Sequence, residues 1–319
     1  MLKVVFFGTP QIAVNSIMKL LNFADVNIAA IVTQPDRPAG RGKKLVEPPV
    51  KVCAIKNAIT LFQTNSIRKD SELINTLKAI QPDFFITFAF GQILSQEVLD
   101  IPKIATINLH ASLLPKYRGA NPIQRAIYNG DNETGITTMI TVLGLDAGDV
   151  CLSEKIAITE EMTSIELADI ISEKAPFLLY RTIKGLASGA LIPQKQEESL
   201  VTFANKFVKE DGLIDWRKTS RQIHDQVRSM VDWPNAFTRY DGKVLKILET
   251  KIQNELVDPD CKPGEVVKVS KEGILVRTQD SNLLISKLKP ENKSVMNAYD
   301  WSNGVKLKSG NFFESLEVE

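Results

Sequence analysis

Apolar residues in the first part of the chain fall into short, nearly continuous runs that alternate with amphipathic stretches. The runs predict strands at Lys3–Phe7, Ile28–Thr33, Asp83–Ala89, Ala105–Leu109 and Gly135–Val142. The stretches between and after them predict helices at Ile12–Leu21, Ser71–Ile80 and Ser164–Leu186. Continuous apolar runs are typical of strands buried on both faces, and strands that alternate with helices favour parallel pairing. We therefore expect a Rossmann-like α/β fold with a doubly wound, mainly parallel sheet.

The pattern changes near residues 190–207. Beyond this point, shorter alternating segments predict strands at Val244–Leu248, Glu265–Val269, Ile274–Thr278 and Leu283–Ser286, with turn residues between them. Short, closely spaced strands are typical of a small barrel or sandwich. The sequence thus predicts an α/β domain over residues 1–190, a linker over 191–207 and a smaller, OB-like β-barrel domain over 208–319.

Length and composition are consistent with two globular domains. The chain has 319 residues, of which 44% are hydrophobic and 24% charged, values that are ordinary for a soluble protein. Its start does not resemble a signal peptide, and no apolar run approaches the roughly 18 residues of a membrane helix. We therefore expect a cytoplasmic protein with no membrane partner.

Cysteine and histidine usage argues against a metal centre. The chain has three cysteines and two histidines, all scattered singly, so no ligand spacing is recognisable. We expect the thiols to be reduced and structural. The net charge of +1 means that any contact with nucleic acid has to use local basic patches.

The turn after the first predicted strand lacks a dinucleotide-binding pattern. Gly8-Thr9-Pro10 stands where a G-x-G-x-x-G sequence would hold a pyrophosphate, and only the first glycine is present. This turn disfavours a nicotinamide-dependent dehydrogenase.

Two polar residues share one face of the fourth predicted strand. If the strand extends through His110, Ile107 and Leu109 point to one side, and Asn108 and His110 point to the other. A lone histidine is more often a buried residue bonded to a nearby carbonyl. An asparagine beside it adds an amide donor for a developing oxyanion, while the histidine supplies acid or base capacity near neutral pH. Together they favour acyl-type transfer at the carboxyl edge of the sheet, where ligands bind in such folds.

A glycine-rich segment after Gly135–Val142 offers a carboxylate partner. Asp146 and Asp149 follow this strand, and Gly144 and Gly148 allow the backbone to turn sharply. An aspartate between glycines is usually only a turn residue, so the pattern leaves open which carboxylate, if either, orients His110.

At this point the motifs resemble those of a known family, the folate-dependent formyltransferases. The matching motifs are Asn108-x-His110, Ser112-Leu113-Leu114-Pro115-x-Tyr117-Arg118-Gly119 and Gly144-Leu145-Asp146-x-Gly148-Asp149. The loop Thr33–Lys44, the run Gly119–Arg125 and the chain length resemble the members that act on methionyl-tRNA. The resemblance implies that 10-formyltetrahydrofolate donates its formyl group to the α-amino group of methionine on initiator methionyl-tRNA. It also implies a monomer that needs no metal.

The resemblance carries site roles onto matching positions. It implies catalytic roles for Asn108, His110 and Asp146, with Asp146 orienting His110. It places the folate against Ser112, Leu113, Leu114 and Pro115, and against Phe88, Phe90, Gly91 and Gln92. Phe90 is a departure, because the family often has tyrosine there.

A basic loop and the second domain are the predicted tRNA contacts. The loop from Gln34 to Lys51 carries four cations that the resemblance assigns to the acceptor end of tRNA, Arg37, Arg41, Lys43 and Lys44, with Arg41 foremost. In the second domain, basic and acidic residues are nearly balanced. The stretch Arg217–Arg228 offers a basic helical face, on which His224 is expected to be a surface residue.

Three alternatives stay open at this stage. The catalytic residues would also suit another folate formyltransferase, acting on a purine precursor or an amino sugar. A non-catalytic RNA-binding protein would use the barrel alone. A dehydrogenase is disfavoured by the turn at Gly8.

Overall fold

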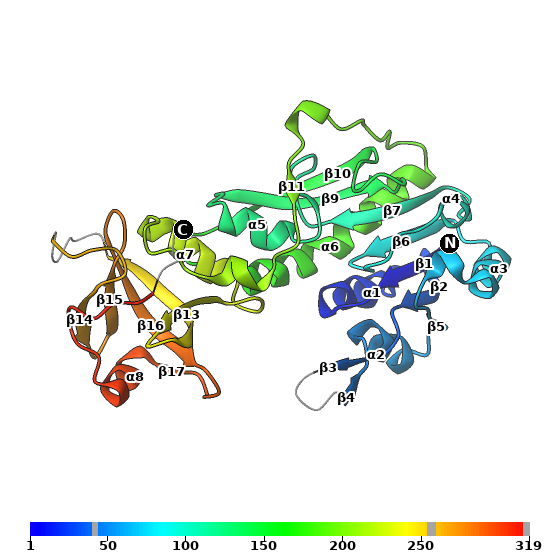
Figure 1. The fold of residues 1–319 in the computed structure, drawn as a ribbon. Coiled ribbons are helices and arrows are strands. Elements are labelled where there is room, and N and C mark those ends of the chain that lie inside the picture. The colour runs from blue at the N-terminus through cyan, green and yellow to red at the C-terminus, as the bar shows by residue number, and fades with distance from the viewer. Residues whose placement is uncertain (40–43, 254–259, 315–319) are drawn as a thin grey trace. The chain divides into compact units, whose positions relative to one another are not determined.

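A computed structural model describes residues 1–39, 44–253 and 260–314 (Figure 1). By packing, the chain forms two compact units: the first comprises residues 1–122, 133–157 and 168–204, and the second residues 123–132, 158–167 and 205–319. Two short segments from within the first 190 residues thus pack with the second unit. The predicted domains at 1–190 and 208–319 stay a prediction, because packing units and independently folding domains need not coincide.

A seven-stranded sheet forms the centre of the first unit. Its strand order is β10-β9-β7-β6-β1-β2-β5. The bounds are β1 Leu2–Gly8, β2 Val26–Thr33, β5 Leu61–Gln63, β6 Phe84–Phe88, β7 Ala105–His110, β9 Glu133–Ile140 and β10 Val150–Ala157. The pairs from β5 to β7 are parallel, whereas β9 pairs antiparallel with both β7 and β10. The predicted mainly parallel α/β sheet is confirmed.

Helices cover both faces of this sheet. They are η1 Gln11–Ala13, α1 Val14–Leu20, α2 Pro49–Lys56, η2 Ile67–Lys69, α3 Ser71–Ile80, α4 Gln96–Leu99 and α6 Ser164–Ala187. Val5 and Phe7 of β1 pack with Leu77 of α3 in one buried cluster. On the other face, α1 and α6 are joined by a hydrogen bond from Asn15 Nδ2 to Ser172 O of 2.8 Å (Figure 1).

Two small strand pairs complete the first unit. The hairpin of β3 (Arg37–Ala39) and β4 (Lys44–Val46) is antiparallel. The pair of β8 (Arg118–Gly119) and β11 (Phe203–Ala204) is parallel, and η3 (Glu198–Leu200) precedes β11. The second pair brings the segment predicted as a linker into contact with the residues that follow β7.

The second unit is built on an antiparallel sheet of order β12-β13-β16-β15-β14, with β17 beside β16. Its elements are α5 Pro122–Tyr128, η4 Lys209–Gly212, α7 Ser220–Ser229, β12 Ala236–Tyr240, β13 Lys243–Gln253, β14 Val266–Ser270, β15 Gly273–Arg277, β16 Asn282–Pro290, β17 Met296–Asn297 and α8 Ala298–Val305. Near the C-terminus, Phe313 N donates to Gly264 O at 2.9 Å and Glu314 N donates to Arg239 O at 3.0 Å. This segment therefore bridges the two edge strands, and the predicted small barrel is confirmed.

The expectation that His224 is a surface residue was wrong. His224 is only 3% exposed, and its Nδ1 lies 3.0 Å from Thr250 Oγ1. Burial lowers the pKa of its imidazole, against the opposing effect of the Glu161 carboxylate. Asp225 and Arg228 beside it are also buried and form a 2.7 Å ion pair. Charge counting failed here because it does not detect burial against β13 and the segment around Glu161.

Candidate active site

Asn108 and His110 lie at the carboxyl end of β7, and Asp146 lies in the loop between β9 and β10. Because β9 runs antiparallel to β7, this loop begins beside the amino end of β7, and it folds back toward His110 at the carboxyl end. The structure brings Asp146 to the histidine, with His110 Nδ1 3.5 Å from Asp146 Oδ2. Of the two carboxylates that the sequence left open, Asp146 is thus the one that the structure places beside His110.

The environment of His110 orients its ring and sets its tautomer. The ring is 5% exposed, and its Nε2 lies 2.8 Å from the carbonyl oxygen of Tyr117. A carbonyl can only accept a hydrogen bond, so Nε2 carries a hydrogen. In the neutral ring, Nδ1, which faces Asp146, is then the nitrogen that can accept a hydrogen bond.

The loop that carries Asp146 has an unusual backbone. Asp146 has φ of 47°, a left-handed conformation that costs a non-glycine residue about 1 kcal/mol. A Cβ atom at Gly148 would collide with the carbonyl oxygen of Ile140, so only glycine fits there. The Asp146 carboxylate accepts a 2.8 Å hydrogen bond from Gly119 N at Oδ2, the same oxygen that lies 3.5 Å from His110 Nδ1.

Asn108 is oriented by the neighbouring strand. In the parallel register of β6 and β7, Thr87 pairs with Asn108. Thr87 Oγ1 donates to Asn108 Oδ1 at 2.8 Å, so the amide nitrogen of Asn108 points away from Thr87 and keeps its donors for another group. Thr87 was not predicted, although it is the single polar residue in the apolar run from Phe84 to Ala89 and was a usable signal.

Comparisons with known proteins match both units. A formyl transferase model matches residues 2–183, and a model of the formyl transferase C-terminal domain matches residues 206–306. A methionyl-tRNA formyltransferase of Clostridium acetobutylicum is 46% identical over 310 residues, which cover 97% of this chain and 99% of the relative. The chain belongs to the methionyl-tRNA formyltransferase family. The resemblance found in the motifs is thereby confirmed.

Solved structures share the fold of the methionyl-tRNA formyltransferase family at lower identity. An N-formyltransferase from Helicobacter canadensis, in complex with folinic acid and dTDP-3-aminofucose, has a TM-score of 0.66 at 21% identity over 89% of this chain and 99% of the other. A methionyl-tRNA formyltransferase from Clostridium thermocellum has a TM-score of 0.54 at 20% identity over 80% and 95% of the two chains. At these identities the likeness concerns the fold.

The first predicted folate segment of this family member follows β6 and exposes backbone rather than side chains. Phe88 and Phe90 are 3% and 4% exposed, and the Phe90 ring packs edge-on against Phe7 at 5.3 Å. Between and after them, Ala89 and Gly91 have positive φ of 50° and 78° and are exposed. A tyrosine at position 90 would therefore have its hydroxyl in or near the core, and phenylalanine suits this position.

Gln92 serves the loop itself. Its Oε1 accepts from Ile67 N at 2.8 Å and its Nε2 donates to Thr64 O at 2.7 Å. Phe90 O accepts hydrogen bonds from Thr9 Oγ1 at 3.0 Å and Gln34 Nε2 at 2.8 Å. These bonds hold the backbone after β6 in one conformation, and two of them use both polar atoms of the Gln92 side chain.

The second predicted folate segment follows β7. Ser112 is fully buried, and its hydroxyl donates to Lys116 O at 2.6 Å. Leu113, Leu114 and Pro115 are half-buried, so apolar surface remains on this loop. Of the predicted group, Ser112 shapes the turn, and the next three residues present the apolar face.

The predicted tRNA loop is only partly described. Arg37 and Lys44 are exposed at the ends of the β3–β4 hairpin, whereas Arg41 and Lys43 lie outside the described residues. Lys51, at the loop's far end, contacts Asp36 at 2.6 Å and Glu47 at 2.9 Å. Its charge is thus neutralised within the protein, which leaves the hairpin as the basic part of the loop.

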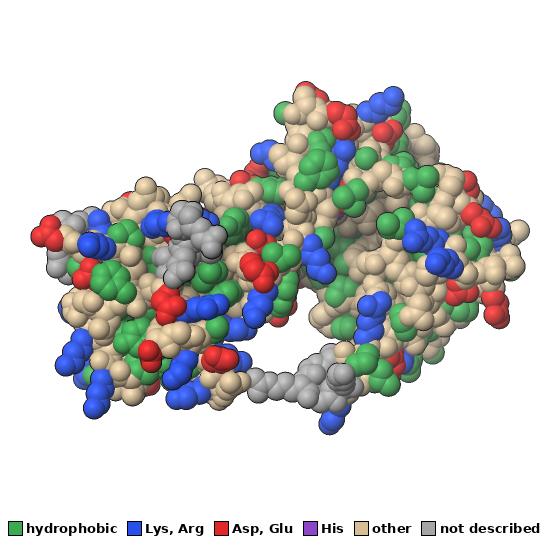
Figure 2. All heavy atoms as spheres, in the orientation of Figure 1, with side chains coloured by type: hydrophobic (Ala, Val, Ile, Leu, Met, Phe, Trp, Pro, Cys, Tyr) green, Lys and Arg blue, Asp and Glu red, His purple; other side chains and the backbone are tan. Residues whose placement is uncertain are grey.

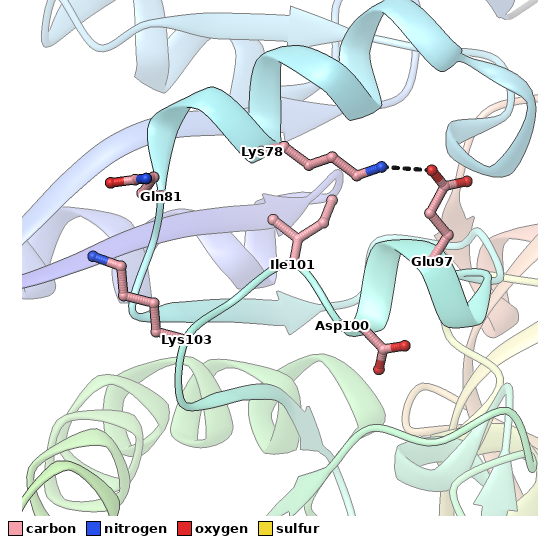
Figure 3. Close-up of a pocket in the computed structure, with 6 residues that line it drawn as sticks. All are labelled: Lys78, Gln81, Glu97, Asp100, Ile101 and Lys103. Atoms are coloured by element: carbon pink, nitrogen blue, oxygen red, sulfur yellow. Dashed lines mark hydrogen bonds and ion pairs between the residues drawn. The ribbon is translucent and has the colours of Figure 1, made fainter.

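A separate hollow of about 550 Å³ lies away from these residues (Figure 3). It is lined by Lys78, Gln81, Glu97, Asp100, Ile101 and Lys103. These residues come from α3, α4 and the loops that precede β6 and β7, at the amino ends of the strands. Lys78 and Glu97 form a 2.7 Å ion pair there, and the hollow shares no residue with the predicted site.

The remaining features concern metals, membranes and charge. Within residues 1–39, 44–253 and 260–314, no cluster of three or more histidine, cysteine, aspartate or glutamate side chains is arranged to hold a metal ion. In the same ranges, no helix is long and apolar enough to span a membrane. Figure 2 shows Lys and Arg side chains interspersed with Asp and Glu on the visible face.

Proposed function

We propose that this protein transfers the formyl group of 10-formyltetrahydrofolate to the α-amino group of methionine on initiator methionyl-tRNA. The observation that carries the proposal is the grouping of Asn108, His110 and Asp146 at the carboxyl edge of the sheet, in a chain that is 46% identical to a methionyl-tRNA formyltransferase over nearly its whole length. The product is formylmethionyl-tRNA for translation initiation.

The chemistry follows from the orientation of the three side chains. A neutral amine attacks the formyl carbon, a new C–N bond forms, and negative charge develops on the formyl oxygen. The amide nitrogen of Asn108 donates to that oxygen, since its own oxygen is held by Thr87. His110 Nδ1 takes up the proton that the amine loses, and the Asp146 carboxylate stabilises the resulting imidazolium.

His110 then passes this proton on toward the folate. As the bond between the formyl carbon and the folate nitrogen breaks, that nitrogen receives a proton and tetrahydrofolate departs. The number of protons is unchanged, because the amine gives up one and the folate gains one. Neither a metal nor a nucleotide takes part in this scheme.

The folate is proposed to lie between the two loops that follow β6 and β7. The exposed backbone at Ala89 and Gly91 suits the polar edge of a pterin, and half-buried Leu113 and Leu114 suit its flat face. A division between backbone polar groups and apolar side chains is common in small-ligand sites. Phe88, Phe90 and Gln92 support this loop from within.

The tRNA is proposed to meet the hairpin that carries Arg37, Arg41, Lys43 and Lys44, and the barrel of the second unit. Phosphate contacts by several cations give affinity that falls with salt. We further propose that the protein is a cytoplasmic monomer.

An acceptor panel tests the function. Purified protein is mixed with 10-formyltetrahydrofolate and with one acceptor at a time: charged initiator tRNA, charged elongator methionine tRNA, glycinamide ribonucleotide or a dTDP-amino sugar. We expect formylated product chiefly from the initiator species. Absence of that product, or faster reaction of a small-molecule amine, would refute the proposal.

A further inference from the structure

The backbone around the catalytic residues is held by residues 196–204, a segment that the structure places beside β8. Thr202 Oγ1 accepts a hydrogen bond from Tyr117 N at 2.9 Å, and Tyr117 is the residue whose carbonyl orients His110. Ala204 pairs with Gly119, and Gly119 is the residue whose amide holds the Asp146 carboxylate. This segment lies between residues 2–183 and 206–306, which the two family models match.

Within this segment, the side chain of Gln196 bonds directly to the Asp146 loop. Its Nε2 donates to the carbonyl oxygens of Asp146 at 2.8 Å and Gly148 at 2.7 Å. Both hydrogens of the amide nitrogen are thus used on the backbone of one short loop. The loop has glycines at 144 and 148, and its residues 142–145 are exposed, so these two bonds help to hold its shape.

Arg118 sets the direction in which the Gln196 amide points. Arg118 is 5% exposed, and its Nε and Nη2 donate to Gln196 Oε1 at 3.1 and 2.9 Å. A reversed amide would place its NH₂ group against the guanidinium and its oxygen against two carbonyls. Arg118 therefore forces Nε2 toward Asp146, and Glu198 holds the guanidinium in turn at 2.8 Å.

The position of the Asp146 carboxylate is sensitive to this support. Asp146 has a left-handed backbone, and its side chain has to stay near His110 Nδ1 during proton transfer. A misplacement of about 1 Å in such a group costs up to roughly 10²-fold in rate. Loss of the two carbonyl contacts gives the loop freedom of this order.

We propose that Gln196 is a positioning residue for formyl transfer, which holds the backbone of Asp146 so that its carboxylate faces His110, while Arg118 orients the Gln196 amide. The inference rests on the proposed roles of Asp146 and His110. It makes the segment between the two domains part of the active-site architecture rather than a simple connector.

Two substitutions of Gln196 test the proposal. Gln196→Leu keeps the approximate volume and removes all four hydrogen bonds, and Gln196→Glu keeps the acceptor for Arg118 and removes the donors to the loop. We expect kcat to fall about 10- to 100-fold in both, with KM for folate and for tRNA changed less than about two-fold. The control is Gln194→Ala, whose exposed residue contacts Val150 through the backbone; it should leave kcat unchanged.

A double-mutant cycle separates positioning from general destabilisation. In an Asp146→Asn background, Gln196→Leu should cost little further activity, because the carboxylate that it positions is already gone. Full kcat in folded Gln196→Glu, or an equally large loss in the Asp146→Asn background, would overturn the proposal. If Gln196→Leu does not fold, Gln196→Glu decides the matter. Failure of the unmodified protein to formylate methionyl-tRNA would instead refute the proposed function.

Discussion

The two histidines of the chain lie in comparable buried environments in the two units, yet we propose a catalytic role for only one. Both are buried, and each has a backbone carbonyl near Nε2, from Tyr117 for His110 and from Glu160 for His224. They differ at Nδ1, which faces the Asp146 carboxylate in the first unit and the Thr250 hydroxyl in the second. A carboxylate stabilises an imidazolium far better than a hydroxyl does. His224 has its neighbouring carboxylate at the other nitrogen, with Nε2 3.6 Å from Oε2 of the largely exposed Glu161.

The surroundings sharpen this contrast. His110 ends a strand at the edge where parallel α/β sheets bind ligands, and Asn108 shares its face. His224 lies within helix α7. There Asp225 and Arg228 form a buried ion pair, and Arg228 also donates to the carbonyls of Thr159 and Met162. The first site therefore has groups left for a substrate, and the second cluster joins parts of its own unit.

The largest expected effect concerns the structural cluster. Asp225→Ala leaves the buried Arg228 guanidinium without its carboxylate, which should lower the free energy of unfolding by about 3–5 kcal/mol. Urea unfolding would measure this, with Asp232→Ala at an exposed position as control. A loss below about 1 kcal/mol would show that the pair is not structurally important.

The next effect concerns the catalytic edge. Asn108→Ala removes the proposed donor to the formyl oxygen and should lower kcat about 10²- to 10³-fold with little change in stability. The control is Asn303→Ala on α8, an exposed asparagine of the second unit. Retention of kcat within about three-fold would rule out Asn108 as an important donor.

A third prediction uses the lowered pKa of His224. Because the unfolded chain has a histidine pKa of about 6.5 and burial lowers the pKa in the folded state, the unfolded state binds more protons as the pH falls below this value. The free energy of unfolding should then decrease on acidification from pH 7.5 to 5.5. His224→Asn should reduce this dependence, and an identical dependence in both proteins would contradict the assignment.

The smallest expected effect concerns the described cations of the hairpin. Arg37→Ala or Lys44→Ala should raise KM for tRNA a few-fold and reduce the slope of log affinity against log salt by about 1. Kinetics at several salt concentrations would measure it, with exposed Lys19→Ala on α1 as control. Equal effects in the control would argue that the hairpin has no special role.

Much of the fold could be predicted because its pattern is local. The amphipathic stretch at Ser71–Ile80 coincides with α3, and alternation along Ala105–His110 correctly put Asn108 and His110 on one face. The site was harder to predict from the sequence, because its geometry depends on contacts between residues that are distant in the chain. Asp146 lies beside His110 through a loop with a left-handed backbone, and the hydrogen bond from Gln196 to this loop joins residues 50 positions apart.

The same limit explains the error at His224. The charged stretch with Arg217, Arg221 and Arg228 has the composition of a solvated face, and only the packing of α7 against β13 and residues 158–167 buries the inner side of this helix. The local charge pattern cannot show that Arg228 pairs with Asp225, three residues away on the helix. Nor can it show that the same guanidinium donates to carbonyls more than 60 residues away in the sequence.

The most direct test compares the two histidines in one assay. Single-turnover formylation of initiator methionyl-tRNA, with saturating 10-formyltetrahydrofolate, is measured for His110→Asn and His224→Asn at a temperature where both are folded. The account predicts a fall of about 10²- to 10⁴-fold for His110→Asn and a rate within about two-fold of the unmodified protein for His224→Asn. Similar rates for the two variants would contradict it.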